Sequence, residues 1–141
     1  MTNTIKSMRG LALFFACAYA CAADAEEIYF AFDAAGTTKD LALAANWTNA
    51  TGVVTAPDAT KTGVIDCRGT EQKFTLSANT SLLGLRLTNR ANDLSTTVQI
   101  GQNNATGAAT LTLGAEGLDA GGYPSRVLLY QPVVPSGTQD W

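Results

Sequence analysis

Short runs of alternating apolar and polar residues recur along the chain after its first 25 positions. Each run is at most five residues long and rich in Val, Ile, Leu or Thr, which pack well on a pleated, half-buried surface. Helical periodicity is hard to find after residue 45. The pattern therefore predicts an all-β protein with strands at 28–32, 63–67, 73–76, 83–87, 97–100, 110–113 and 126–130.

The alternation has a period of two, so one face of each strand is expected to be core and the other solvated. In the 83–87 run the leucines at 83, 85 and 87 fall on one face. The expected inward positions include Leu85, Val98, Ile100, Leu111 and Leu113, and the expected outward positions include Arg86, Gln99 and Thr112.

Stretches dominated by Gly, Asn and Asp separate the runs, at 89–93, 101–107 and 114–122. Glycine adopts positive φ without steric penalty, and Asn and Asp tolerate it while bonding their own backbone. These stretches are therefore expected to be corners between strands. With no helical insert between the strands, their spacing suits either a solenoid or a β-sandwich.

The scarcity of aromatic residues favours the solenoid. Beyond Phe74 the only aromatic residues are Tyr123, Tyr130 and Trp141, whereas bulkier side chains usually fill the wide core of a sandwich. A narrow interior lined by Leu, Val and Ile from stacked rungs fits better. We therefore expect residues 59–141 to form the few rungs of a right-handed parallel β-helix, with a β-sandwich as the alternative.

The segment 23–58 differs from the rest because it is rich in Phe, Tyr and Trp. A solenoid needs a cap over its first rung, since raw apolar ends and unpaired strand edges promote aggregation. This segment is the expected N-terminal cap and first loop. Within it, residues 41–45 are expected to form one helical turn, ended by Asn46.

Residues 1–22 have the form of a secretion signal. Lys6 and Arg9 precede an apolar run at 11–20, and small residues then allow cleavage after 22 or 25. A membrane-spanning helix needs roughly 20 apolar residues, about twice the length of this run. Cys21 also allows a lipoprotein interpretation, although the aliphatic residue usual three positions before such a cysteine is absent.

Charge and cysteine content narrow the class of protein further. Of the nine Lys and Arg residues, Lys6 and Arg9 lie in the signal, so seven remain against twelve Asp and Glu. A mildly acidic chain without a basic block argues against nucleic-acid binding. Signal removal would also leave Cys67 without a cysteine partner, which excludes a disulfide framework in the exported form.

The residue types needed for catalysis are scarce. The chain has no histidine, which removes the commonest base near neutral pH and the commonest metal ligand. Cys67 is expected to be a buried, inert thiol rather than a nucleophile. One dense ionisable cluster exists, and we interpret it as solvated charges flanking a strand rather than as a catalytic site; it consists of Asp66, Arg68, Glu71 and Lys73.

The Gly-rich stretch 114–121 allows a comparison with calcium-binding β-rolls, because Glu116 and Asp119 lie among its glycines. A single imperfect copy is not a repeat, and hard cations need six to eight oxygen ligands. We therefore expect a plain corner here. The sequence predicts no catalytic residue, no metal site and no cofactor.

Two stretches carry a resemblance to a known family. The first is Leu43-Ala-Ala-Asn-Trp-Thr48, followed by Ala56-Pro-Asp58 and Thr62-Gly-Val-Ile65. The second is Ala109-Thr-Leu-Thr-Leu-Gly-Ala-Glu-Gly-Leu-Asp119, after which Gln139-Asp-Trp141 has the form of a following Gln-x-Trp motif. These residues resemble secreted bacterial proteins with autotransporter-associated β-strand repeats.

The resemblance implies a right-handed parallel β-helix on a large exported protein, often ending in an autotransporter barrel or a sorting tail. Neither is present, so we expect the chain to be an N-terminal fragment that would continue into further β-rungs. The expected function is an adhesive or structural module on the cell surface, without catalytic activity. The alternative is a carbohydrate-active module, either polysaccharide-binding or lyase-like. The expected partner is a polysaccharide or protein ligand of unknown identity.

Export should remove the signal, so the mature chain is predicted to begin at Ala23 or Glu26. Intact-mass measurement of the protein recovered from the secretory compartment checks this start. A retained Met1 would contradict the secretion signal, and a diacylglyceryl adduct on Cys21 would support the lipoprotein interpretation instead.

Overall fold

The computed structural model describes residues 25–31, 39–67, 71–88, 97–101, 109–121 and 126–137. Several features expected from the sequence lie outside these residues. They are the signal at 1–22, Arg68, the corner at 89–93, most of the corner at 101–107, Tyr123, and the motif at 139–141.

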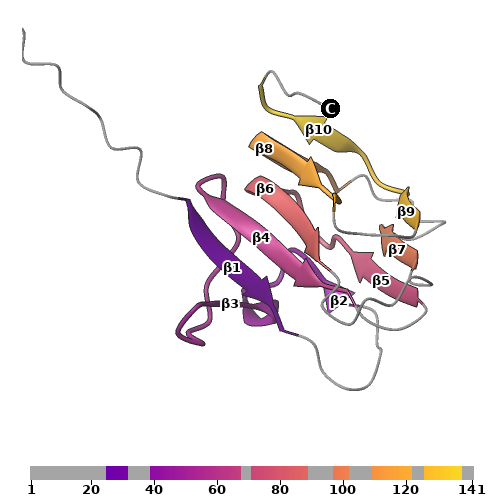
Figure 1. Cartoon of the computed structure of the whole chain (residues 1–141). Helices are drawn as coiled ribbons and strands as arrows, with labels where there is room; N and C mark the ends of the chain where they lie inside the picture. Colours follow the sequence, from indigo (N-terminus) through magenta and orange to yellow (C-terminus); the bar gives the residue numbers. More distant parts are fainter. Residues whose placement is uncertain are drawn as a thin grey trace, which may run out of the picture.

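Apart from one 3-10 turn, the regular elements of the described residues are all strands, which form two sheets (Figure 1) and confirm the all-β prediction. Sheet A has the order β10-β8-β6-β4-β1-β3, and sheet B has the order β2-β5-β7-β9. The strands are β1 (Glu26–Phe30), β2 (Lys39–Asp40), β3 (Trp47–Asn49), β4 (Lys61–Asp66), β5 (Glu71–Thr75), β6 (Thr80–Thr88), β7 (Thr97–Ile100), β8 (Leu111–Asp119), β9 (Arg126–Leu129) and β10 (Val133–Pro135).

From β4 onward, successive strands alternate between the two sheets, and each pairs in parallel with the strand two places earlier or later. Among the described residues, antiparallel pairing is confined to β1 with β3 and to an isolated bridge between Thr48 and Val54. Immunoglobulin-like sandwiches are built from antiparallel sheets. The observed pairing is therefore unlike theirs.

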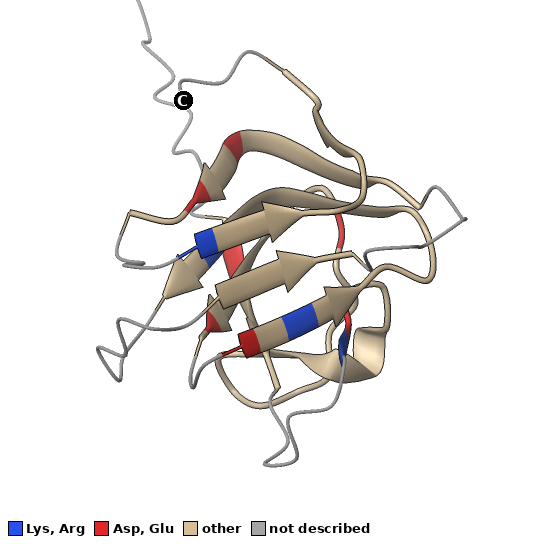
Figure 2. Ribbon diagram, turned by 90° about the vertical axis from the view of Figure 1, so that its right-hand side faces the viewer, with Lys and Arg blue, Asp and Glu red and all other residues tan. Residues whose placement is uncertain are grey.

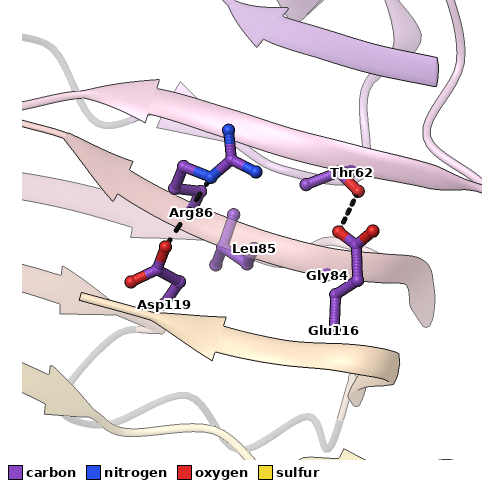
Figure 3. Close-up of a pocket in the computed structure, with 6 residues that line it drawn as sticks. All are labelled: Thr62, Gly84, Leu85, Arg86, Glu116 and Asp119. Atoms are coloured by element: carbon purple, nitrogen blue, oxygen red, sulfur yellow. Dashed lines mark hydrogen bonds and ion pairs between the residues drawn. The ribbon is translucent and has the colours of Figure 1, made fainter. Parts of the chain in front are cut away.

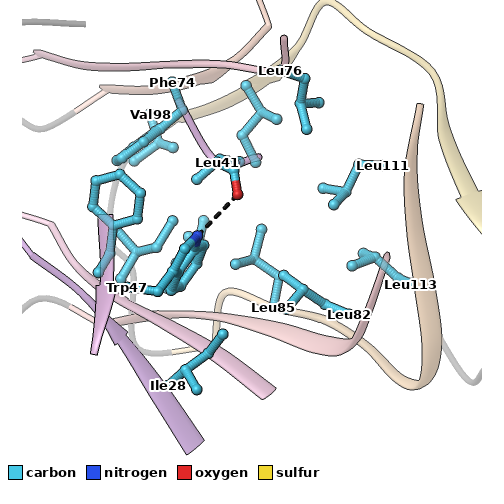
Figure 4. Packing of buried hydrophobic residues seen from close by; sticks show 14 of the residues in the cluster. Ile28, Leu41, Trp47, Phe74, Leu76, Leu82, Leu85, Val98, Leu111 and Leu113 are labelled. Atoms are coloured by element: carbon cyan, nitrogen blue, oxygen red, sulfur yellow. Dashed lines mark hydrogen bonds between the residues drawn. The ribbon is translucent and has the colours of Figure 1, made fainter. Parts of the chain in front are cut away.

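Parallel pairing places equivalent residues of successive strands in register. In sheet B, Phe74 pairs with Ile100, which pairs with Leu129. The inward residues of both sheets fill one core (Figure 4). All five predicted inward residues are at most 1 % exposed, which confirms that part of the register: Leu85, Val98, Ile100, Leu111 and Leu113.

The outward assignment holds for the three polar residues, which are partly exposed: Arg86, Gln99 and Thr112. The inward assignment is wrong for Leu83, which is only half-buried, whereas its neighbour Leu82 is 1 % exposed. The register between β6 and β8 shifts between Leu82 and Gly84. Strict alternation fails there, because a bulge separates the inward positions Leu82 and Leu85.

The prediction of a corner is also wrong for residues 114–119, since β8 continues to Asp119. Gly114 and Gly117 of this strand do not form a turn. Gly114 allows the β6 backbone to approach closely, and Gly117 lies at a bulge. A Cβ on Gly114 would lie 2.9 Å from the carbonyl oxygen of Leu83, and Gly117 adopts a φ of 60°. Such positions favour glycine inside a strand as well as at a turn.

The aromatic residues gather at the N-terminal end of the core. Phe30 of β1 packs edge-on against Trp47 and Phe74, with ring centroids 4.9 and 5.2 Å apart. The Trp47 indole Nε1 donates a hydrogen bond to the Leu41 carbonyl oxygen at 2.9 Å. A Cβ on Gly63 would lie 2.9 Å from the Trp47 ring. The missing side chain at Gly63 thus makes room for the indole.

The strand β3 lies on the outer edge of β1 in sheet A. The sequence predicts one helical turn over 41–45, whereas the structure has a 3-10 turn over Ala44–Asn46, which includes Asn46 and leads directly into β3. After β3 the chain reverses, because the Asn49 side chain accepts hydrogen bonds from the backbone N–H groups of Thr51 and Val53. Among the residues described, no helix is long and apolar enough to cross a membrane.

The register predicts unequal effects of two neighbouring substitutions. Leu111→Ala should lower the free energy of unfolding by about 2–5 kcal/mol, since it removes a fully buried side chain. Thr112→Ala, on the partly exposed face of the same strand, should change it by less than about 0.5 kcal/mol. Urea unfolding of the two variants measures the difference, and equal losses would contradict the assigned faces.

Candidate functional site

The ionisable cluster noted in the sequence is divided between the two sheets. Asp66 ends β4 in sheet A, whereas Glu71 and Lys73 lie on β5 in sheet B. Glu71 and Lys73 pair with each other at 3.1 Å, and Glu71 also accepts a hydrogen bond from Gln99. Both members of the ion pair are about half exposed, as expected for solvated surface charges.

Cys67 follows β4 and is fully buried against the core. Its thiol lies 3.6 Å from the Ile65 carbonyl oxygen, which can accept its weak hydrogen bond. Burial, with a smaller contribution from the Asp66 carboxylate, raises the pKa of the thiol to about 12. Because the thiolate is the reactive form, this environment suits a structural cysteine.

A hollow of about 220 Å³ opens on the outer face of sheet A (Figure 3). Strands β4, β6 and β8 each contribute to it, so its walls come from three successive parallel strands. Its floor is the backbone of β6, where Gly84 has no side chain and Leu85 points toward the core. The lining residues are Thr62, Gly84, Leu85, Arg86, Glu116 and Asp119.

A bulge in β8 forms one wall of the hollow. Three residues separate Leu113 from Gly117 in β8, opposite the single Leu83 of β6. The extra residues carry Glu116 across β6, so that its carboxylate accepts a hydrogen bond from the Thr62 hydroxyl of β4. A Cβ on Gly84 would lie 2.6 Å from the Glu116 Cβ, so this crossing requires glycine beneath it.

Arg86 forms the opposite wall and lies between two carboxylates. Its Nη1 donates a hydrogen bond to Glu27 at 2.6 Å, and its Nε lies 3.7 Å from the Asp119 carboxylate. The Tyr29 hydroxyl also donates to Glu27 at 2.7 Å. The hydrogen bond from Tyr29, followed by that from Arg86, holds the pKa of Glu27 below its usual value.

The hollow therefore has carboxylate groups that accept hydrogen bonds and a guanidinium group that donates them. Glu27, Glu116 and Asp119 carry negative charge around the single positive charge of Arg86. Across the described part of the chain, no group of three His, Cys, Asp or Glu side chains is arranged to hold a metal ion. The arrangement can donate and accept hydrogen bonds from one ligand at the same time.

Sequence reasoning did not identify this site. It placed Arg86 on the outer face, but it assigned Glu116 and Asp119 to a corner. The available signal was the repeated glycine at 84, 114 and 117, because glycine within strands often marks a bulge or a close backbone approach. That Glu116 reaches over Gly84 depends on the parallel register, which the alternation of residues does not specify.

Comparison with known proteins adds no assignment: no family model matches the chain, and neither the curated proteins nor the solved structures include a significant match.

The environment of Cys67 predicts slow thiol chemistry. With the pKa of the thiol raised to about 12, almost no thiolate is present at pH 8, and the fully buried sulfur is also shielded from reagents. Alkylation by iodoacetamide should be at least about 100-fold slower in the folded chain than in urea. Mass spectrometry over time measures both rates, and similar rates would show that this thiol is accessible.

Proposed function

We propose that the chain is an exported cell-surface module with a structural or adhesive role and without catalytic activity. The observation that carries the proposal is the alternation of parallel strands between two sheets, which continues from β4 to β10. Such stacking builds an elongated body with long faces and needs no closed active site. The apolar run at 11–20 has the form of a secretion signal and supports export of the chain.

In this proposal the two sheets form a right-handed parallel β-helix. Connections between parallel strands of one sheet are right-handed in nearly all known cases. Residues 59–141 provide the rungs and residues 23–58 provide the cap and first loop. The antiparallel strand β3 supports the cap assignment, since it covers the edge of β1 that would otherwise be exposed.

The opposite end of the stack supports continuation into further rungs. Leu129 occupies the same register position as the buried Phe74 and Ile100, yet it is 46 % exposed. Tyr130 and Val134 are 39 % and 45 % exposed nearby. An inward position that remains exposed is expected where a next rung would cover it.

The two sheets differ in how their last strands are protected. On either side of β10, the Pro132 carbonyl oxygen accepts from Leu111 of β8 and the Ser136 N–H donates to Leu113 of β8, so the intervening Pro135 faces the free edge. Proline there lacks the N–H that a pairing strand would need. Strand β9 of sheet B has no such proline, and no charged residue occurs between 127 and 137 (Figure 2).

A carbohydrate-active role is the second candidate, and the hollow on sheet A favours it. Carboxylates at Glu116 and Asp119 with the guanidinium of Arg86 are groups that hydrogen-bond sugar hydroxyls. The exposed position of both carboxylates favours ligand binding over bond cleavage, since enzymes usually close their active sites to expel water. Polysaccharide recognition would also suit an adhesive module.

The exposed end predicts association of the mature chain. Residues 23–141 should form concentration-dependent assemblies through β9 and its neighbour β10, because apolar edge strands pair with other strands. Leu129→Lys should keep the chain monomeric, since an edge lysine opposes pairing. Sedimentation velocity across a concentration series measures the distribution of masses.

Ser81→Lys is the matched control, because it adds the same charge on an exposed position of β6, away from the free edge. It should leave association unchanged. A wild-type chain that remains a monodisperse, cooperatively melting monomer would contradict the open-ended stack.

A further inference from the structure

The hollow over Gly84 retains unused hydrogen-bonding capacity. A carboxylate has about four acceptor positions and a guanidinium has five N–H donors. Glu116 accepts from Thr62 through one oxygen, and Asp119 accepts from the Gly121 backbone N–H at 2.9 Å. Arg86 uses Nη1 for Glu27 and holds Nε 3.7 Å from Asp119. Acceptor positions therefore remain on Glu116 at one wall, and both acceptor and donor positions remain on the Asp119–Arg86 pair at the other.

The side chains are also held in place before a ligand arrives. Thr62 is 3 % exposed and directs its hydroxyl to Glu116. Because Gly84 has no side chain, the Glu116 Cβ packs over the β6 backbone, within 2.6 Å of where a Cβ on Gly84 would lie. Ion pairs with Glu27 and Asp119 hold Arg86. A fixed set of polar groups loses less conformational entropy on binding than mobile surface side chains would.

The charges disfavour ionic ligands. An anion would meet the carboxylates of Glu27, Glu116 and Asp119. A hard cation needs six to eight oxygen ligands and would meet the guanidinium of Arg86 beside the same carboxylates. A neutral molecule with several hydroxyl groups avoids both conflicts, because each hydroxyl donates to a carboxylate and accepts from an N–H.

The size of the hollow limits the ligand to one small unit. Sites that enclose a whole drug-sized molecule usually measure about 300–1,000 Å³. A hollow of about 220 Å³ on an open sheet face is smaller, and both ends of a bound chain could run on across neighbouring strands. This suits one ring of a polymer better than an isolated ligand that must be surrounded.

We propose that this hollow binds one sugar unit of an uncharged polysaccharide, with its hydroxyl groups donating to Glu116 and Asp119 and accepting from Arg86. The proposal rests on the surface role proposed above and names the ligand class for it. The outer face of the parallel strands β4, β6 and β8 supports the sugar ring, and the bulge in β8 places Glu116 against it.

Native affinity electrophoresis of the exported, signal-free chain provides the test. The gels contain one soluble polysaccharide each: dextran, galactomannan and arabinoxylan as uncharged probes, and polygalacturonate as the anionic comparison. At least one uncharged probe should retard the wild-type chain, and polygalacturonate should not. Retardation should persist when the salt concentration is raised, since binding of a neutral ligand is not screened by ions.

Two conservative variants locate the site. Glu116→Gln and Asp119→Asn should each weaken binding roughly tenfold, the scale of one lost charge-assisted hydrogen bond. The amide oxygen of Glu116→Gln can still accept from Thr62, so this variant should keep its fold.

Glu71→Gln is the matched control, because it makes the same charge change on the exposed face of sheet B. Melting temperatures of all variants show whether they are folded.

The proposal is overturned if none of the three uncharged probes retards the chain, or if only polygalacturonate does. Equal weakening by Glu71→Gln would also overturn it, because the contact would then not be at the hollow. These outcomes are separate from failure of the surface role. A chain that is exported and associates but binds no sugar contradicts only the ligand assignment, whereas a chain that binds sugar but retains Met1 contradicts only export.

Discussion

The parallel register between successive strands is the constraint on which the rest of this structure depends. Each inward side chain rests on the one at the same position of the next strand, so its size must match its neighbours. Ile28, Gly63 and Leu85 occupy one such position. Gly63 breaks the succession of large side chains, and the Trp47 indole fills the space. With Cys67 as the sole described cysteine, burial and backbone hydrogen bonds hold the strands together.

The same register explains why the outer face can form a site. Strand β8 departs from the register over the residues that follow Leu113 and returns to it at Gly117, where Leu118 packs against the core again. The departure affects the solvent side and leaves the inward positions nearly continuous. Glu116 is the side chain that the departure redirects, and Thr62 and Gly84 are the residues that accommodate it.

Alternation of residue types was enough to predict the all-β class and the inward positions Val98, Ile100, Leu111 and Leu113, because burial of one face follows directly from a period of two. It failed at Leu83 and over 114–119. Glycine serves turns, bulges and close approach alike, so local composition does not distinguish them. The hollow could not be predicted, since its walls come from three strands whose relative register depends on long-range pairing.

In the bulge of β8, the residues that can contact a ligand differ from the residues that stabilise the core. Among its additional residues, Gly114 is buried against the β6 backbone and favours glycine, whereas Ala115 and Glu116 are exposed and can change while Leu113 and Leu118 keep their places in the core. A repeated stack of strands has many equivalent positions at which a similar insertion is tolerated. Recognition on such a scaffold can therefore diversify by short insertions, with little of the loss of stability that usually accompanies a new site.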